Sequence, residues 1–494
     1  MNLSFLILIP VITLLAMLIA NSKQAKAIAL AGSVIQLLFS IALAYFYTEE
    51  RNAGNESPLL FEFQHDWFTA WNITYHVGVD GISIAMILLT SVVLLTGVLI
   101  SWKVKDRVKE FFFLLVFLAA SAFGFIISMD LFTLFFFFEL AVIPKYLLIA
   151  KWGSGNKEDN AMKLALMLMG GSALVLIGIL GTYYYSAQTG AATFDLVQLS
   201  KTTFSHESQM FLFPMMFMGF GVLSALFPFH TWAPEGHSSA PTAASMFLAG
   251  ISMKLGGYGC LRVATVLFPE AAQAYSSTII VLACIGILYG AFVTLRQTDL
   301  KMMNAYSSVS HCGFVLLGIG MLTKTAITGA VLQMVSHGIM TALFFAVIGM
   351  LYERTHTRIG SQMGGLMKVM PFIGTVFIIA GLTSLGLPGF SGFVAEMTVF
   401  VGSFQHNDLF HRIATIVATM SIVVTAVYIL RAVGIALWGP ITKEEFKHLT
   451  DATWNEKLAA IILVSCIVII GVLPFWLVGI IQSTTQTLFG SILP

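Results

Sequence analysis

Charge is scarce in this sequence, and the scarcity limits what the chain can be. Charged side chains make up 10% of its 494 residues, whereas hydrophobic side chains make up 58% and the mean hydropathy is +0.90. A soluble core cannot bury that much apolar surface, so the composition excludes a soluble globular protein and indicates an integral membrane protein. The formal net charge is only +1, so we expect no nucleic-acid partner.

Cysteine is also scarce, with four residues and no CxxC spacing. Cys260, Cys284, Cys312 and Cys466 all fall inside apolar segments that we expect to be helical. This pattern argues against an iron–sulfur cluster, a zinc site or a disulfide framework in this chain. We expect the four thiols to be packing residues.

Long apolar runs dominate the rest of the chain and predict an all-α polytopic membrane protein with about 14 transmembrane helices. The first run has no basic region before it and no small-residue cleavage site, so we expect a retained span and not a signal peptide. The predicted spans are 3–20, 27–47, 82–101, 111–128, 130–150, 162–184, 210–228, 241–265, 277–295, 302–321, 326–351, 370–402, 412–437 and 457–482.

Basic residues are concentrated in alternate loops. The odd-numbered loops carry about 17 lysines and arginines and the even-numbered loops about four. Because cytoplasmic loops carry the excess of basic residues, we expect both termini on the non-cytoplasmic side.

The segment 228–256 is the part of the sequence around which the other polar groups are arranged. We expect one apolar helix to end at Pro228 and His230, a turn to carry Glu235 and His237, and a second helix to hold Lys254 near its middle. A charge at that depth costs at least about 2.5–3.5 kcal/mol, so partners or water must compensate Lys254. The alternative, in which the side chain reaches back to the headgroups, would require it to span about nine residues of helix, roughly 13 Å.

Span 130–150 carries a second costly group, Glu139, followed by Pro144 and Lys145. Pro144 removes a backbone hydrogen bond, so we expect a kink there and a wetted site. Lys145 lies about 120° around a straight helix from Glu139 and about 9 Å along it, so only a kink and a long side chain bring the two together. The alternative is that Lys145 extends to the cytoplasmic surface.

Two histidines and one further glutamate lie in the second half of the chain. His311 and His337 are either hydrogen-bonded packing residues or relays that pass a proton through their ring nitrogens. Their placement between Lys254 and Glu396 favours the relay. Before Glu396, the glycines and proline of residues 386–392 predict a broken helix in span 370–402.

The order of these features suggests two related units. A kinked span with a glutamate and a proline-interrupted span occur within 111–265, and a histidine span and an interrupted span with a glutamate occur within 277–437. We therefore expect two inverted five-helix repeats, with broken helices in spans 7 and 12. Residues 1–110 would form three N-terminal helices with an outer loop, and residues 438–494 a cytoplasmic loop with the last helix.

Several motifs together resemble the antiporter-like proton-pumping subunits of respiratory complex I. They are the segment 228–256, the Glu139 helix, His-Val-Gly-Val-Asp-Gly at 76–81, Ala-Tyr-Ser-Ser-Val-Ser-His at 305–311 and Leu-Pro-Gly-Phe-Ser-Gly-Phe-Val-Ala-Glu at 387–396. The resemblance covers roughly residues 76–437. It is greatest to members of the M type, because an L-type member would continue after span fourteen into a long lateral helix, whereas this sequence stops at Pro494.

The resemblance implies a role for each residue. Glu139 would be the carboxylate of the first half-channel and Lys254 the central proton carrier, with His311 and His337 as the connecting relay and Glu396 as the residue that delivers to the outer side. It implies a non-redox translocase subunit in the cell inner membrane, next to other complex I membrane subunits, including further antiporter-like ones. Flavin and iron–sulfur clusters would lie in partner subunits, and the quinone would bind elsewhere.

One position departs from the family pattern. The family places a lysine on span seven at the position that is Leu223 here, while Lys145 stands where the family has an apolar residue. We hypothesise that the partner lysine of Glu139 has moved from span seven to span five. Two other functions remain open: a subunit of a multisubunit cation/proton antiporter or membrane-bound hydrogenase, and a structural membrane subunit that has lost transport.

Overall fold

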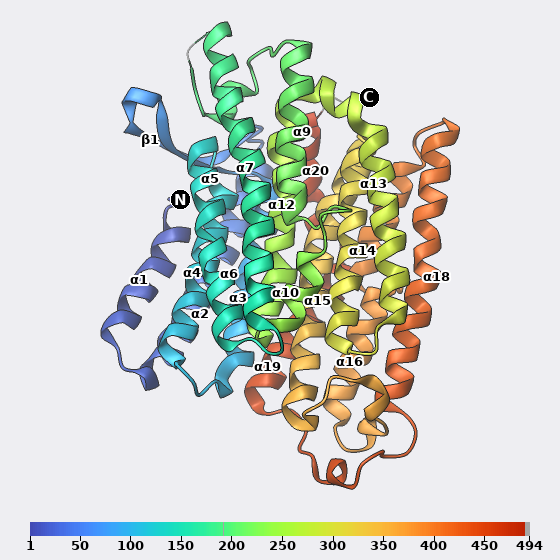
Figure 1. The fold of residues 1–494 in the computed structure, drawn as a ribbon. Helices are drawn as coiled ribbons and strands as arrows, with labels where there is room; N and C mark the ends of the chain where they lie inside the picture. Colours follow the sequence, from blue (N-terminus) through green and yellow to red (C-terminus); the bar gives the residue numbers. More distant parts are fainter. Residues whose placement is uncertain (191, 490–494) are drawn as a thin grey trace.

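The apolar segments form a bundle of long helices with one small β-hairpin at one end (Figure 1). The computed structural model describes residues 1–190 and 192–489, so the last five residues of the predicted C-terminal segment lie outside the described part. The strands are β1 (Leu60–Phe68) and β2 (Ile73–Val79).

The helices, in chain order, are α1 (Phe5–Ile19), α2 (Ser22–Asn52), α3 (Gly81–Ile100), α4 (Val108–Ile127), α5 (Leu131–Leu140), α6 (Val142–Trp152), α7 (Lys157–Thr189), α8 (Leu196–Leu199), α9 (His206–Leu223), α10 (Trp232–Ser239), α11 (Thr242–Phe247), α12 (Met253–Gly259), α13 (Pro269–Arg296), α14 (Leu300–Gly320), α15 (Lys324–Thr355), α16 (Pro371–Ser384), α17 (Ser391–Ser403), α18 (Leu409–Leu437), α19 (Trp454–Val472) and α20 (Phe475–Phe489). Two π-helical segments, η3 (Leu248–Ser252) and η4 (Cys260–Thr265), flank α12.

Nine helices in the described residues are long and apolar enough to cross a membrane, which confirms a multi-pass membrane protein. On the peripheral helix α18, the exposed residues Ile416, Met420 and Val423 follow one another at helical spacing. An exposed apolar stripe of this kind suits contact with lipid. By contrast, α15 is enclosed on nearly all sides, so polar residues on it face other helices.

The predicted breaks in spans 5, 7 and 12 are present. Span 5 divides at Ala141 into α5 and α6, because Pro144 has no N–H to donate to the carbonyl of Leu140. Span 12 divides into α16 and α17, and the connecting residues Gly386 and Gly389 have positive φ of 71° and 96°.

The details of span 7 were predicted wrongly. Helix α9 ends at Leu223, five residues before Pro228, because Ala225 adopts a left-handed conformation with φ 57° and closes the helix. The residues expected to form a turn are the helix α10. Pro234 lies in the first turn of α10, where the backbone needs no N–H donor, so this proline starts a helix and does not signal a loop.

The span predicted at 457–482 is also interrupted, and this break was not predicted. Helix α19 ends at Val472 and α20 begins at Phe475, after Pro474. The two pieces lie along opposite ends of α3: Asn455 Nδ2 donates to the carbonyl of Leu99 at 2.8 Å, and the N–H of Gly81 donates to Thr484 Oγ1 at 2.7 Å. They therefore follow one path across the bundle.

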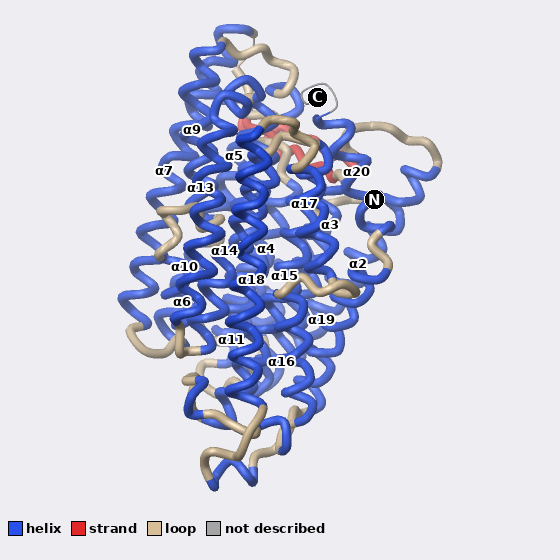
Figure 2. The backbone as a smooth tube through the Cα atoms, turned by 90° about the vertical axis from the view of Figure 1, so that its right-hand side faces the viewer, coloured by secondary structure: helices blue, strands red, loops and turns tan. Residues whose placement is uncertain are grey.

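The start of α1 and the end of α20 lie towards the same end of the bundle, as the two views show (Figures 1 and 2). The hairpin of β1 and β2 lies at this end too, whereas the loop between α18 and α19 lies at the opposite end. This arrangement agrees with an even number of crossings. Which end faces the cytoplasm stays a prediction.

The all-α prediction missed the hairpin, which forms within the loop expected at 48–79. Its strands pair antiparallel, with Phe63 opposite Val77 and His65 opposite Tyr75. In β2, His76 is buried and its two ring nitrogens lie 2.5 Å from the carboxylate of Asp195 and 3.3 Å from that of Glu62. His76 thus connects the hairpin to the start of α8.

The stability of this connection should depend on pH. Burial by itself lowers the pKa of His76, but the carboxylates of Asp195 and Glu62 outweigh burial and raise the pKa above its ordinary value. The connection therefore stabilises the fold fully below about pH 6.5, the unfolded-state value, and this contribution is lost as the pH rises through the folded-state pKa. We expect the thermal stability of the wild type to fall relative to that of His76→Gln as the pH rises from about 6.5 through the folded-state pKa of His76. Thermal unfolding of both proteins in detergent measures this difference. Parallel pH curves for the two proteins would contradict it.

Candidate functional site

Lys254 lies in α12, between the two π-helical segments. Each π-helical segment carries an extra residue in its turn and shifts the direction of nearby carbonyls, a feature that often occurs at functional sites. The ammonium of Lys254 donates to the carbonyl of Ala249 in η3 and lies 2.7 Å from His337 Nδ1. Its side chain is 1% exposed, so the alternative of a lysine that reaches the headgroups is wrong.

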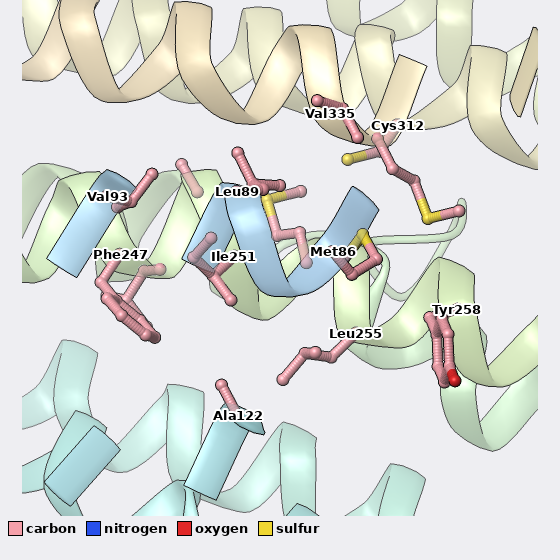
Figure 3. Packing of buried hydrophobic residues seen from close by; sticks show 14 of the residues in the cluster. Met86, Leu89, Val93, Ala122, Phe247, Ile251, Leu255, Tyr258, Cys312 and Val335 are labelled. Carbon is pink, nitrogen blue, oxygen red and sulfur yellow. The ribbon is translucent and has the colours of Figure 1, made fainter. Parts of the chain in front are cut away.

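The other face of the same helix is apolar. Figure 3 shows Phe247, Ile251 and Leu255 in one cluster with Met86 and Leu89 of α3. These residues are buried and recur every four positions, so they form one apolar stripe of the helix, which packs among α3 and α4. The packing fixes the rotation of the helix, with Lys254 directed to α15.

His337 and His311 continue the series of polar groups. Their rings, from α15 and α14, stack with centroids 5.0 Å apart and an angle of 29° between the planes. His311 Nδ1 lies 3.3 Å from Glu396 Oε1, and His311 Nε2 lies 3.1 Å from Ser384 Oγ. Both histidines and Glu396 are buried.

Four of the six predicted site residues therefore form one continuous chain, Lys254–His337–His311–Glu396 (the relay chain). Its members come from α12, α15, α14 and α17, which are far apart in sequence. Glu396 is the only carboxylate of the chain, and no acidic side chain among the described residues forms an ion pair with Lys254. Because two adjacent cations repel strongly in a buried setting, Lys254 and His337 can carry one positive charge between them.

Glu139 and Lys145 lie apart from the relay chain. Lys145 is 1% exposed, so the alternative in which it extends to the surface is wrong. Within the described residues the two form no ion pair, although the charge of Glu139 acts on Lys145 at longer range. Glu139 Oε1 is buried and has no hydrogen-bond partner in the described part of the chain.

Leu223, the position at which the family resemblance implies a lysine, lies between these two groups of residues. Phe138, next to Glu139, packs edge to face on Phe220, one turn before Leu223. A Cβ on Gly256 would come within 2.9 Å of the carbonyl carbon of Leu223, so the end of α9 touches the helix of Lys254. A lysine at this position would stand near Glu139 and near the helix that carries Lys254.

Among the buried charged groups that were not predicted, Arg262, Asp80 and Lys301 lie near the relay chain or on its helices. Arg262 lies two turns after Lys254 on the same helix and forms an ion pair with Asp80, which also caps α3 by accepting from the N–H of Ser83. The sequence held a signal for this pair, because Arg262 falls inside span 241–265 and Asp80 in the motif 76–81. We used that motif only as part of the family resemblance.

The predicted span ten, 302–321, begins two residues after α14 does and so leaves Lys301 in a loop. It lies in the first turn of α14, is buried, and donates to the carbonyl of Ala240. His237, also buried, interacts electrostatically with both Lys301 and Lys254 and also with His337. His237 therefore lies near Lys301 and the relay chain but hydrogen-bonds to neither, and its Nε2 instead lies 3.2 Å from Met253 Sδ.

The glycines between α16 and α17 give a prediction about Glu396. A Cβ on Gly386 would lie 2.7 Å from Glu396 Oε2, whereas a Cβ on Gly389 would meet nothing within 4 Å. Both have positive φ, so each alanine substitution should cost about 1–2 kcal/mol of stability. We expect only Gly386→Ala to displace the Glu396 carboxylate from His311, which cryo-electron microscopy of the two variants would show. An unchanged His311–Glu396 contact in Gly386→Ala would contradict the assigned packing.

Comparisons with known proteins cover nearly the whole chain. The transmembrane family described as NADH:quinone oxidoreductase/Mrp antiporter matches residues 128–423, which include all six predicted site residues. The chain is 35% identical to NAD(P)H-quinone oxidoreductase chain 4 2 of Picosynechococcus sp., covering 98% of this chain and 93% of that one. It is 33% identical to NADH-quinone oxidoreductase subunit M of Rickettsia prowazekii, with 98% of each chain covered. A chain of respiratory complex I from Thermus thermophilus with bound NADH shares the fold, with a TM-score of 0.89, 24% identity and 99% of both chains covered.

Proposed function

The chain belongs to the NADH:quinone oxidoreductase/Mrp antiporter transmembrane family, and we propose that it is the M-type proton-translocating membrane subunit of an NADH:quinone oxidoreductase. The observation that carries the proposal is the relay chain, in which a buried lysine, two stacked histidines and a glutamate follow one another without a gap filled by apolar side chains. Ionisable groups at membrane depth are costly, and a connected series of them supports proton transfer.

The geometry suggests the order of proton steps. The ammonium of Lys254 donates to His337 Nδ1, so transfer of its proton leaves a neutral lysine and a positively charged imidazole. His337 and His311 stack and share no hydrogen bond, so the next transfer needs a rotated ring or a bridging water at His337 Nε2. From His311 the proton passes to Glu396 across the 3.3 Å contact.

We assign a route for proton entry to one end of the relay chain and a route for proton exit to the other. Lys301 and His237 lie between Lys254 and the end of the bundle that carries the predicted cytoplasmic loops, and they supply the inner intake. At the other end, Glu396 lies beside Gly386 in the break between α16 and α17, where backbone groups freed from the helix can bind water. Redox steps in partner subunits would drive the cycle by changing the charge pairing around Lys254 and Glu139.

The finer assignments belong to the same proposal. We place about 14 spans in the membrane, with N-terminal helices in 1–110, inverted units in 111–265 and 277–437, and the last loop and span in 438–494. Both termini would face the non-cytoplasmic side of the cell inner membrane. The chain would hold no redox cofactor, with flavin and iron–sulfur clusters in partner subunits and the quinone bound elsewhere. It would assemble with other membrane subunits, including antiporter-like ones.

A subunit of a cation/proton antiporter is the second candidate, because the family description includes the Mrp antiporters. The two relatives described above are named as quinone oxidoreductase subunits, which favours the first candidate. Mass spectrometry of the chains that co-purify in mild detergent separates the two. Flavin and iron–sulfur subunits with NADH oxidation support the oxidoreductase, and recovery of small membrane chains alone supports the antiporter.

Removing Lys254 tests translocation itself. We expect Lys254→Ala to lower the number of protons moved per quinone reduced while the complex still assembles, because the central carrier is lost. The measurement is proton uptake in vesicles with NADH as donor. The exposed Lys105 provides a matched control, and Lys105→Ala should pump like the wild type. Unchanged pumping by assembled Lys254→Ala would support a transport-inactive structural subunit.

The relocated lysine can be tested in the same assay. If Lys145 supplies the positive charge that interacts with Glu139, Lys145→Met should reduce proton translocation by about a hundredfold, the lower end of the range for a proton-transfer group. Adding Leu223→Lys to that variant should restore much of it, because position 223 lies between Glu139 and the helix of Lys254. Normal pumping by Lys145→Met alone would refute the relocation.

A further inference from the structure

A compact group of metal-ligand side chains lies outside the relay chain, at the turn between α17 and α18. His406, Asp408 and His411 each present one ligand atom, and these atoms all lie within 4.8 Å of one another. In the described residues this is the one such group of histidine, cysteine, aspartate or glutamate. The turn lies at the end of the bundle that holds the β1–β2 hairpin, next to the start of α18 (Figure 1).

His406 is oriented by a neighbouring element. Its Nε2 lies 2.6 Å from the carbonyl of Met321, which follows α14, so Nε2 carries the proton and donates. Nδ1 is then the unprotonated nitrogen with a free lone pair. A histidine that ligates a metal through one nitrogen usually donates the other N–H to a carbonyl or carboxylate in this way.

His411 and Asp408 complete the group. His411 Nδ1 lies 2.8 Å from both carboxylate oxygens of Asp408, and the rings of His406 and His411 stack at 4.0 Å with 17° between their planes. An aspartate carboxyl is ionised at neutral pH, as a metal ligand must be. Two imidazoles and one carboxylate therefore meet at one point.

The donor set identifies the class of metal. Two imidazole nitrogens and one carboxylate oxygen, with a water as fourth ligand, suit Zn²⁺ in a tetrahedral site. Ca²⁺ and Mg²⁺ prefer six or more oxygen ligands, which this turn does not supply.

Helix capping accounts for only part of the arrangement. Asp408 caps α18 by accepting from the N–H of His411, and capping needs no second histidine. The stacked position of His406 and its fixed tautomer have no role in the cap. We propose that His406, Asp408 and His411 form a Zn²⁺ site that joins the α17–α18 turn to the end of α14.

Direct binding tests the site on the purified complex, with an affinity tag that contains no histidine. Zn²⁺ is titrated in competition with a chelator, and Co²⁺ is used as a spectroscopic probe whose visible absorption reports four-coordinate binding. We expect the wild type to bind, and His406→Gln and His411→Gln each to bind at least tenfold more weakly and to lose the Co²⁺ absorption. The exposed His448 is the matched control, and His448→Gln should bind like the wild type.

Asp408→Asn separates the cap from the metal ligand. Asparagine caps helices as well as aspartate, so the thermal stability without metal should stay close to that of the wild type, while Zn²⁺ affinity falls. Equal Zn²⁺ affinity in the wild type, His406→Gln and His411→Gln would overturn the site. Because binding is measured without any transport assay, this result is independent of the proposed function.

Discussion

A positive charge enclosed in an apolar bundle is the constraint on which the rest of the structure depends. Lys254 has no carboxylate within contact in the described residues, so a carbonyl from a π-helical segment and the ring of His337 take the place of water around it. A carbonyl and an imidazole stabilise an ammonium group less than a carboxylate does. A lysine with these partners therefore gives up its proton more easily than a lysine beside a carboxylate. The same contacts that make the charge tolerable make its proton transferable.

Interrupted helices supply the backbone that this site needs. The helix of Lys254 changes to π-helical geometry on both sides, α9 ends early at Leu223, and α16 and α17 separate at Gly386, beside Glu396. Irregular backbone at membrane depth is stable only where protein or water satisfies it. The uninterrupted helices α14 and α15 carry the two histidines, and the interrupted helices carry Lys254 and Glu396 at the two ends of the relay chain.

The buried charged residues and the helix breaks could be found from the sequence. A charged residue, a proline or a glycine cluster inside a long apolar run is visible in the sequence itself. Glu139, Lys254, Glu396 and the breaks near Pro144 and Gly386 were identified in this way. Contacts between helices leave no such signal, so the sequence could not place Glu139 outside the relay chain or join Arg262 to Asp80. Lys301 was missed because the predicted span began two residues after α14, and α10 was missed because its proline starts a helix. The hairpin was missed because its segment was predicted to be a loop from its polar composition alone.

The central claim is that the groups of the relay chain act in series, and a double-substitution comparison of proton translocation tests it most directly. His337→Leu and Glu396→Gln would be measured singly and together in the assembled complex. Steps in series predict that the double variant pumps no worse than the more impaired single variant. Losses that multiply in the double variant would contradict the account, because they would place His337 and Glu396 on separate routes.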